Sequence, residues 1–309
     1  MEAEHRLTIV QARFIACLAA AGVAWAAHAT EGGTTAFPNG GDDFLVAAMP
    51  PPGFYAQVYA TRYTADRLTG DSGDLPLERF ALRVNAMTPR LDWVKAVSVL
   101  GADRWGTLVV VPYLDIDLAL APAPGVQVSG SRKGFGDLTF GNGLHWTLGD
   151  FEMVNALDLV IPSGSYDRVR LVNPGRNQWV LRLNHMGTWI VARSWDVSYR
   201  IHWDHNFENP ETHYRSGQTA YLNYAIGWKP TPATTLGFAG YVLKQVTDDR
   251  GAGAPVDGNR LGARGFGPAA KHFFDSGIAV TAKYFRGQAA RNGPRGDSFW
   301  LYLSFPVGA

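Results

Sequence analysis

The segment from Ser194 to Asn206 alternates between apolar and polar residues at every second position. Its apolar members are Trp195, Val197, Tyr199, Ile201 and Trp203, and its polar members are Asp196, Ser198, Arg200, His202 and Asp204. Because successive strand side chains point to opposite faces, one face of a strand here is aromatic and aliphatic while the other is charged. The length and the aromatic content are typical of a strand that separates lipid from water.

The same alternation recurs along most of the chain. It is found at 108–120, 138–148, 178–184, 219–228 and 298–305. Strands that cross a bilayer must close into a barrel, because an open edge in lipid would leave backbone groups without hydrogen bonds. The pattern therefore predicts an all-β fold, a transmembrane antiparallel up-and-down β-barrel of about twelve strands, with ten or fourteen as the alternatives.

A soluble exported β-sandwich is the second architecture that such strands allow. In a sandwich the apolar faces of two sheets pack on each other. So many consecutive aromatic-rich strands present more apolar surface than one sandwich core accommodates, which favours the barrel. No run of eighteen or more apolar residues predicts a membrane-spanning helix, and the hydrophobic fraction of 46% fits a chain that alternates between lipid and lumen.

The first residues of the chain have the pattern of a secretory signal peptide. Arg6 and Arg13 precede the apolar run 14–25, and Ala27 and Ala29 supply the small residues that a signal peptidase reads. We expect residues 1–29 to be removed and the mature chain to be localised in a bacterial outer membrane. The single cysteine, Cys17, lies in the removed part, so no disulfide or thiolate metal ligand is expected.

Residues 30–52 are rich in glycine and proline and end in three consecutive prolines, Pro50 to Pro52. Proline cannot donate a hydrogen bond to a sheet, so this segment is expected outside the barrel wall. It is either a lumen plug or a periplasmic lead-in, and the barrel itself is expected at 53–309. The turn-rich stretches 206–217 and 248–258 are the candidate external loops.

The energy of burying charge in lipid decides which face of the strands lines the lumen. An arginine on the lipid face, such as Arg200, costs roughly 2 to 4 kcal/mol near the bilayer midplane. The polar rows are therefore predicted to face the lumen, where mixed charges could orient a polar headgroup or a phenolic hydroxyl. The candidate pathway residues are Asp115, Asp117, Asp137, His145, Arg182, Asp196, Arg200, His202 and Asp204.

No catalytic constellation, metal site or cofactor site is predicted. A barrel lipase needs its serine and histidine on the lipid side, whereas His145 and His202 belong to polar rows. His202 and His205 are three residues apart and point to opposite faces of a strand, so they do not form a metal pair. The formal net charge of +1 gives no basis for nucleic-acid binding.

Short signatures in a fixed order along the mature chain resemble one known family. They are Glu31-Gly32-Gly33; Pro51-Pro52-Gly53 with Tyr55; Gly134, Gly136, Asp137 and Leu138; Pro162, Gly164, Tyr166 and Asp167; Asn173, Gly175, Asn177 and Trp179; Asn209, Thr212, Tyr214, Ser216 and Gly217; Gly240-Tyr241 with Gln245, Thr247, Asp248, Asp249 and Gly251; and Gly267-Pro268. The set resembles the family linked to the meta-pathway of phenol degradation, also called SphA-like proteins. The resemblance implies an outer-membrane β-barrel that transports hydrophobic or aromatic compounds, and it brings no catalytic residues.

The function expected from the sequence is passive uptake of small hydrophobic or aromatic compounds through an outer-membrane channel. The expected partners are outer-membrane lipid, the solute and the barrel-assembly machinery. That machinery commonly reads an aromatic last residue, whereas Pro306 to Ala309 follow Phe305 here. The alternatives are an outer-membrane barrel enzyme of lipase type and a structural or interaction barrel that transports nothing.

Overall fold

The computed structural model describes residues 31, 35–255 and 259–307, so the predicted signal peptide and its cleavage site lie outside the described residues. Among the described residues, no helix is long and apolar enough to cross a membrane. The strands are β1 (Gly53–Leu68), β2 (Arg79–Val99), β3 (Ala102–Val110), β4 (Tyr113–Ala123), β5 (Val126–Phe135), β6 (Leu138–Leu148), β7 (Phe151–Ile161), β8 (Val180–Val191), β9 (Trp195–Asn206), β10 (Tyr214–Arg215), β11 (Thr219–Thr231), β12 (Thr234–Gln245), β13 (Arg250–Gly251), β14 (Gly262–Phe273), β15 (Ala279–Arg291) and β16 (Pro294–Pro306).

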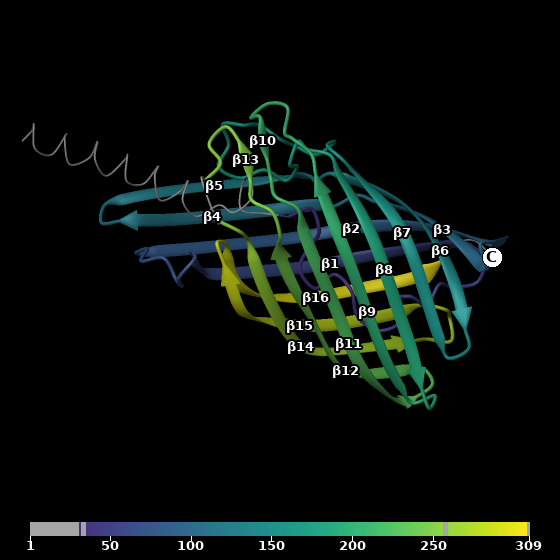
Figure 1. Ribbon diagram of the computed structural model, residues 1–309. Helices are drawn as coiled ribbons and strands as arrows, with labels where there is room; N and C mark the ends of the chain where they lie inside the picture. Colours follow the sequence, from purple (N-terminus) through teal and green to yellow (C-terminus); the bar gives the residue numbers. More distant parts are fainter. Residues whose placement is uncertain (1–30, 32–34, 256–258, 308–309) are drawn as a thin grey trace, which may run out of the picture.

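One antiparallel sheet closes on itself, because β1 pairs with β2 along one edge and with β16 along the other (Figure 1). The sheet holds fourteen strands but crosses the bilayer twelve times. The difference arises because β3 and β4 lie end to end along β2, and β5 and β6 continue one another in the same way. The predicted twelve-stranded all-β barrel is confirmed. Closure removes the unpaired sheet edge that lipid forbids, except beside β5, which pairs with β4 on one side and meets a loop on the other.

The wall is interrupted where these two crossings are split. Pro112 has no N–H to donate, and the N–H of Gly136 donates to the Pro112 carbonyl at 2.8 Å. The β4–β5 hairpin beyond the split projects past the neighbouring strands (Figure 1). Beside β5 the loop 162–179 continues the wall, with the Ser165 N–H donating to the Phe135 carbonyl at 2.8 Å. A Cβ atom on Gly164 would lie 2.7 Å from the Gly136 and Gly175 backbones, so only glycine fits this seal.

The two ends of the barrel differ in the length of their connections. One end carries short turns such as 192–194 and 232–233, and the other carries the loops 162–179, 207–218 and 246–261. In bacterial barrels the short turns face the periplasm and the long loops face outward. Exposed tryptophans lie near both ends of the barrel, as two membrane-interface girdles require, with Trp179 and Trp203 near the long loops and five others near the short turns. The five near the short turns are Trp93, Trp105, Trp189, Trp195 and Trp228.

The outward faces of β9 and β11 give a test of the lipid assignment. Ile226 is 53% exposed on β11, halfway along the strand, between Val197 and Phe238 of its neighbours. We expect Ile226→Arg to lower the free energy of unfolding by about 2 to 4 kcal/mol, measured by urea titration in lipid vesicles. Ala220→Arg, on the same face nearer the loops, should lose about 0 to 1 kcal/mol. Equal losses in the two variants would contradict the assignment.

Candidate functional site in the barrel lumen

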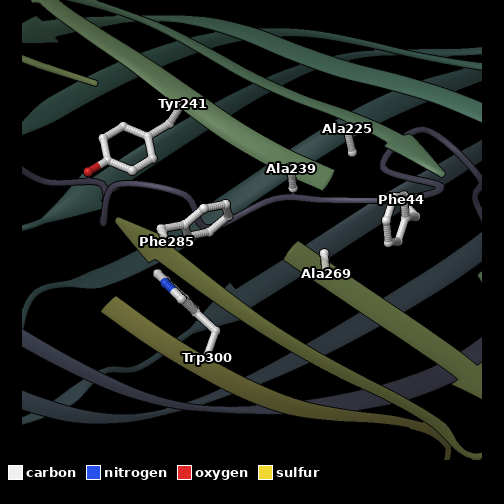
Figure 2. Close-up of a cluster of buried hydrophobic side chains, with 7 residues drawn as sticks. All are labelled: Phe44, Ala225, Ala239, Tyr241, Ala269, Phe285 and Trp300. Atoms are coloured by element: carbon white, nitrogen blue, oxygen red, sulfur yellow. The ribbon is translucent and has the colours of Figure 1, made fainter. Parts of the chain in front are cut away.

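The N-terminal segment lies inside the barrel. Phe44 is buried in a cluster with Ala225, Ala239, Ala269 and Trp300, which come from β11, β12, β14 and β16 (Figure 2). Farther along, the backbone N–H of Leu45 donates to Ser198 Oγ, and that of Ala47 to Thr188 Oγ1, each at 3.0 Å. The segment is thus attached to the lumen faces of β8 and β9 by hydrogen bonds, and to those of β11, β12, β14 and β16 by apolar packing.

Asp43 is the main ionic attachment of this segment. Its carboxylate lies 3.0 Å from Lys271 Nζ and 3.1 Å from Lys283 Nζ, and it accepts a hydrogen bond from the Tyr302 hydroxyl. Lys283 also donates to the Asp42 carbonyl at 3.0 Å. All of these groups are buried or nearly so, and a buried charge is tolerated only when it is paired. The wall lysines and the segment therefore depend on each other.

A second group of charges, which we call the arginine cluster, lies nearer the long loops. It consists of Arg182, Arg200, His202 and Asp204 on β8 and β9 together with Asp42 and Asp158. Arg182 binds Asp204 through two hydrogen bonds of 2.7 and 2.8 Å. Arg200 donates to Asn184 Oδ1 at 2.6 Å and lies 3.2 Å from Asp42 and 3.3 Å from Asp158.

The ring of Phe37, from the N-terminal segment, packs against this cluster. Its centroid is 4.9 Å from the guanidinium carbon of Arg182 and 4.8 Å from that of Arg200, the geometry of cation–π contacts. The imidazole of His202 meets Phe37 edge-on at 4.6 Å and stacks on Tyr221 at 4.2 Å. Within the described part of the chain, neither ring nitrogen of His202 has a hydrogen-bond partner. The cluster therefore combines fixed cations with aromatic faces.

The remaining predicted residues are distributed around the barrel. Asp196 is buried on the lumen face of β9 and accepts a hydrogen bond from Ser198 at 2.6 Å. His145 is held near the short turns between Asp103 at 2.6 Å and Glu152 at 3.0 Å. Asp137 lies at the split in the wall. It accepts the backbone N–H groups of Gly164 at 2.9 Å and Arg176 at 2.8 Å, so it attaches the loop 162–179 to the wall.

The prediction that Asp115 and Asp117 line the lumen is wrong. On β4 they alternate with Leu114 and Ile116, and they stand opposite Asn85 and Arg83 of β2. Asp115 shares an outer hollow with the lipid-facing side chains of Met87 and Phe299. Asp117 pairs with Arg83 and Asp115 with Lys133 on this outer face. The polarity is inverted because this part of the wall projects beyond its neighbours, so its outer face is polar and its lumen face apolar.

Several lumen residues were missed from the sequence. Phe37, Asp42 and Asp43 lie in the segment that its glycines and prolines marked only as lying outside the sheet. Lys271 and Lys283 lie on strands in which both faces carry basic or aromatic residues. The only available signal was the strand parity, which places Lys283 on the same face as Thr281 and Phe285.

Two cavities flank the N-terminal segment. The one nearer the short turns has a volume of about 450 Å³ and contacts residues 41–50. The other, of about 250 Å³, lies between Phe37 and the split in the wall, and we call it the upper cavity. Its apolar lining includes Ala86, Leu108, Val110, Pro112, Leu114, Val160 and Trp300. Arg182 and Arg200 of the arginine cluster lie on its other side together with Asp42 and Asp158, so the upper cavity has one apolar wall and one wall of mixed charge.

The long-loop end of the lumen is closed by polar contacts. The carboxylate of Glu31 accepts hydrogen bonds from Thr212 Oγ1 at 2.7 Å, Asn209 Nδ2 at 2.9 Å and the Tyr166 hydroxyl at 3.2 Å. These three residues belong to the loops 162–179 and 207–218. Because Glu31 is at this end and Gly53 begins β1 at the other, the N-terminal segment extends along the lumen.

A second loop contact centres on Asp249. It accepts the Gly217 N–H at 2.6 Å, Gln245 Nε2 at 2.8 Å and the Tyr214 hydroxyl. Burial raises the pKa of this carboxyl to about 6, although the three hydrogen bonds act in the opposite direction. The folded loops consequently bind a proton more tightly than an unfolded chain does.

A histidine with two side-chain partners lies on the outer wall of the barrel. The ring of His185 contacts Asn155 Oδ1 at 2.8 Å and the Tyr199 hydroxyl at 3.0 Å. Within residues 35–255 and 259–307, no group of three or more His, Cys, Asp and Glu residues is arranged to hold a metal ion.

A closed barrel with an apolar outer face and a charged, partly filled lumen is an outer-membrane β-barrel. The chain belongs to the family described as "Putative MetA-pathway of phenol degradation", whose sequence profile matches residues 65–303. The family resemblance noted in the sequence is confirmed. The comparison with curated proteins gives no match.

Solved structures of other barrels share the fold. The COG4313 outer membrane channel from Pseudomonas putida F1 is 20% identical, with a TM-score of 0.75, and the match covers 88% of this chain and 100% of that one. The translocator domain of the autotransporter NalP from Neisseria meningitidis is 11% identical, with a TM-score of 0.50, and the match covers 84% and 91% of the two chains. At these identities the likeness shows the fold.

Removing the carboxylate of Asp43 tests the attachment of the N-terminal segment. Asp43→Ala leaves Lys271 and Lys283 buried without a counter-charge, which costs about 3 to 5 kcal/mol of folding free energy. We expect the segment to leave the wall and the single-channel conductance in planar bilayers to rise. Asp117→Ala removes an ion pair on the outer face and should leave the conductance unchanged. An unchanged conductance in Asp43→Ala would show that this carboxylate does not hold the segment.

The raised pKa of Asp249 predicts a pH dependence of the loops. Because its folded pKa exceeds the ordinary value of 3.8, its stabilising contribution is complete below pH 3.8 and is lost as pH rises through about 6. Hydrogen-exchange protection factors of residues 214–217 should therefore be higher at pH 4.5 than at pH 7.5, by about tenfold or more. Asp249→Asn should abolish the difference. A pH-independent protection factor in the unmodified protein would refute the assignment.

Proposed function

We propose that this barrel is a passive outer-membrane channel for small hydrophobic or aromatic compounds. The observation that carries the proposal is the upper cavity, with its aliphatic wall on one side and the arginine cluster on the other. Porins for hydrophilic solutes have polar interiors, whereas the lumen face here is apolar where β2 pairs with β4. Leu82, Val84, Ala86, Leu114 and Ile116 make up that face.

The size and chemistry of the upper cavity narrow the solute class. A volume of about 250 Å³ is below the range typical of drug-sized ligands and suits a single small molecule. The ring of Phe37 and the aliphatic wall would contact its apolar body. Arg182 and Arg200 present N–H donors to one polar end, such as a phenolic hydroxyl or a carboxylate. The charged side chains predicted on β8 and β9 would then orient the solute within the pathway.

The upper cavity also reaches the split in the wall at Pro112 and Gly136. There the wall is continued by the loop 162–179, which Asp137 attaches through two backbone hydrogen bonds. A loop sealed by a few hydrogen bonds opens at a lower free-energy cost than a strand held by a full ladder. We propose this seam as the exchange route between the lumen and the membrane for apolar solutes.

The comparisons support the same proposal. The similar Pseudomonas putida protein is described as an outer membrane channel, and the family description refers to phenol degradation. Localisation in the bacterial outer membrane after removal of residues 1–29 fits a channel of this kind. Lipid and the barrel-assembly machinery are its proposed partners, and it needs no cofactor for passive transport.

Filling the upper cavity tests the channel. Ala86→Trp should reduce the entry of a hydrophobic fluorescent naphthylamine into cells several-fold, because the indole occupies the space beside Leu114. Ala282→Trp, on the lipid face of β15, is the matched control and should leave entry unchanged. If cells with and without the protein take up the probe equally, the channel proposal fails and a structural barrel is favoured. Unchanged entry in Ala86→Trp alone would remove the upper cavity from the pathway.

A further inference from the structure

A large hollow lies on the outer face of the barrel, away from the lumen and near the long-loop end. Its volume is about 1290 Å³, and we call it the polar hollow. It lies across β1, β2, β4, β5, β15 and β16, where the projecting hairpins meet the shorter neighbouring strands. Its side chains include Arg83 and Asp117, which pair on the outer face of β2 and β4.

The polar hollow is rich in cations. Five arginines and three aspartates line it, and they are Arg67, Arg79, Arg83, Arg286, Arg295, Asp66, Asp117 and Asp297. Arg83 pairs with Asp117, while Arg67 and Arg295 share Asp74. Arg79 and Arg286 are exposed, and neither has a carboxylate within ion-pair distance among the residues that the structure describes. These two guanidinium groups are therefore available to an anion.

A second, apolar hollow adjoins the first along the same strands. It has a volume of about 370 Å³ and is lined mainly by Ala60, Met87, Tyr113, Phe299 and Leu301. On β2 the outward residues Arg83, Asn85 and Met87 pass from the polar hollow to the apolar hollow, and on β16 Asp297 and Phe299 do the same. The apolar hollow is nearer the bilayer centre, and its polar residues, Arg62, Asn85 and Asp115, lie within it beside the polar hollow.

We propose that the two hollows together bind one phosphorylated acyl glycolipid of the outer leaflet, of the lipid A type. Guanidinium groups bind phosphate through charge-assisted hydrogen bonds, and the hydroxyls of Ser129 and Ser131 in the polar hollow suit a sugar. The apolar hollow receives the upper part of an acyl chain. A soluble phosphate or sugar phosphate would use only the polar hollow, so the adjoining apolar surface favours the lipid. Both hollows open toward the lipid phase rather than the lumen.

The test measures binding of lipid A to the full chain in detergent micelles. The double variant Arg79→Gln with Arg286→Gln should bind about 25-fold more weakly, because each cation near an anionic lipid surface contributes about fivefold. Lys244→Gln, an exposed outward cation at the same end on β12, should change nothing. Wild-type affinity in the double variant, or an equal loss in Lys244→Gln, would overturn the site.

Two further measurements separate the lipid from a free phosphate. Ala60→Trp fills the apolar hollow and should weaken lipid A binding while leaving binding of glucosamine 1-phosphate unaltered. In the unmodified protein, lipid A should bind much more tightly than glucosamine 1-phosphate. Equal affinity for the two probes would show a site for soluble phosphosugars and would overturn the lipid proposal. An unheated gel shift for each variant confirms that the barrel is folded.

Discussion

Every backbone N–H and C=O group in the hydrocarbon layer must find its partner within the sheet, and the rest of this structure depends on that requirement. The sheet closes, and because charge is costly in lipid, its outer face is apolar within the hydrocarbon layer and the charges at that depth lie in the lumen. Once there, Arg200, Lys271 and Lys283 are too enclosed to rely on water alone. The N-terminal segment supplies Asp42 and Asp43 as their counter-charges. The segment is thus part of the electrostatic balance of the wall, in addition to filling the lumen.

The two split crossings interrupt the hydrogen-bond ladder of an otherwise closed sheet. Pro112 and Gly136 interrupt the ladder, and Asp137 recovers part of the lost pairing by holding a loop against β5. The upper cavity lies behind this seam, and the wall of the cavity on this side is apolar. The proposed exchange route for apolar solutes therefore lies where the strand ladder of the wall is interrupted.

The sequence shows which residues of a strand share a face. It does not always show whether that face lines the lumen or lies on the outside of the barrel. On β9 the choice was clear, because Arg200 on the lipid face would be costly and the structure buries it in the lumen. On β4 the same reasoning failed for Asp115 and Asp117. The position of a strand segment along the membrane normal decides whether its outer face can carry charges. Alternation in the sequence does not give that position.

The lumen contacts of the N-terminal segment were beyond the reach of any local pattern. Asp43 meets Lys283 across 240 positions of sequence, and Asp42 meets Arg200 across 158. Nothing in a glycine- and proline-rich stretch marks which of its carboxylates will be buried. Such pairings are set by the curvature and the register of the whole barrel, which exist only after closure.

Because Glu31 lies among the outer loops, the chain passes through the barrel once more than its strands alone require. Twelve crossings return a barrel to the side where it started, so β1 begins and β16 ends at the short turns. The N-terminal segment adds a thirteenth passage through the lumen without forming a strand. Residue 31 and Pro306 consequently face different compartments, and reporters attached at these two places would sample opposite sides of one membrane.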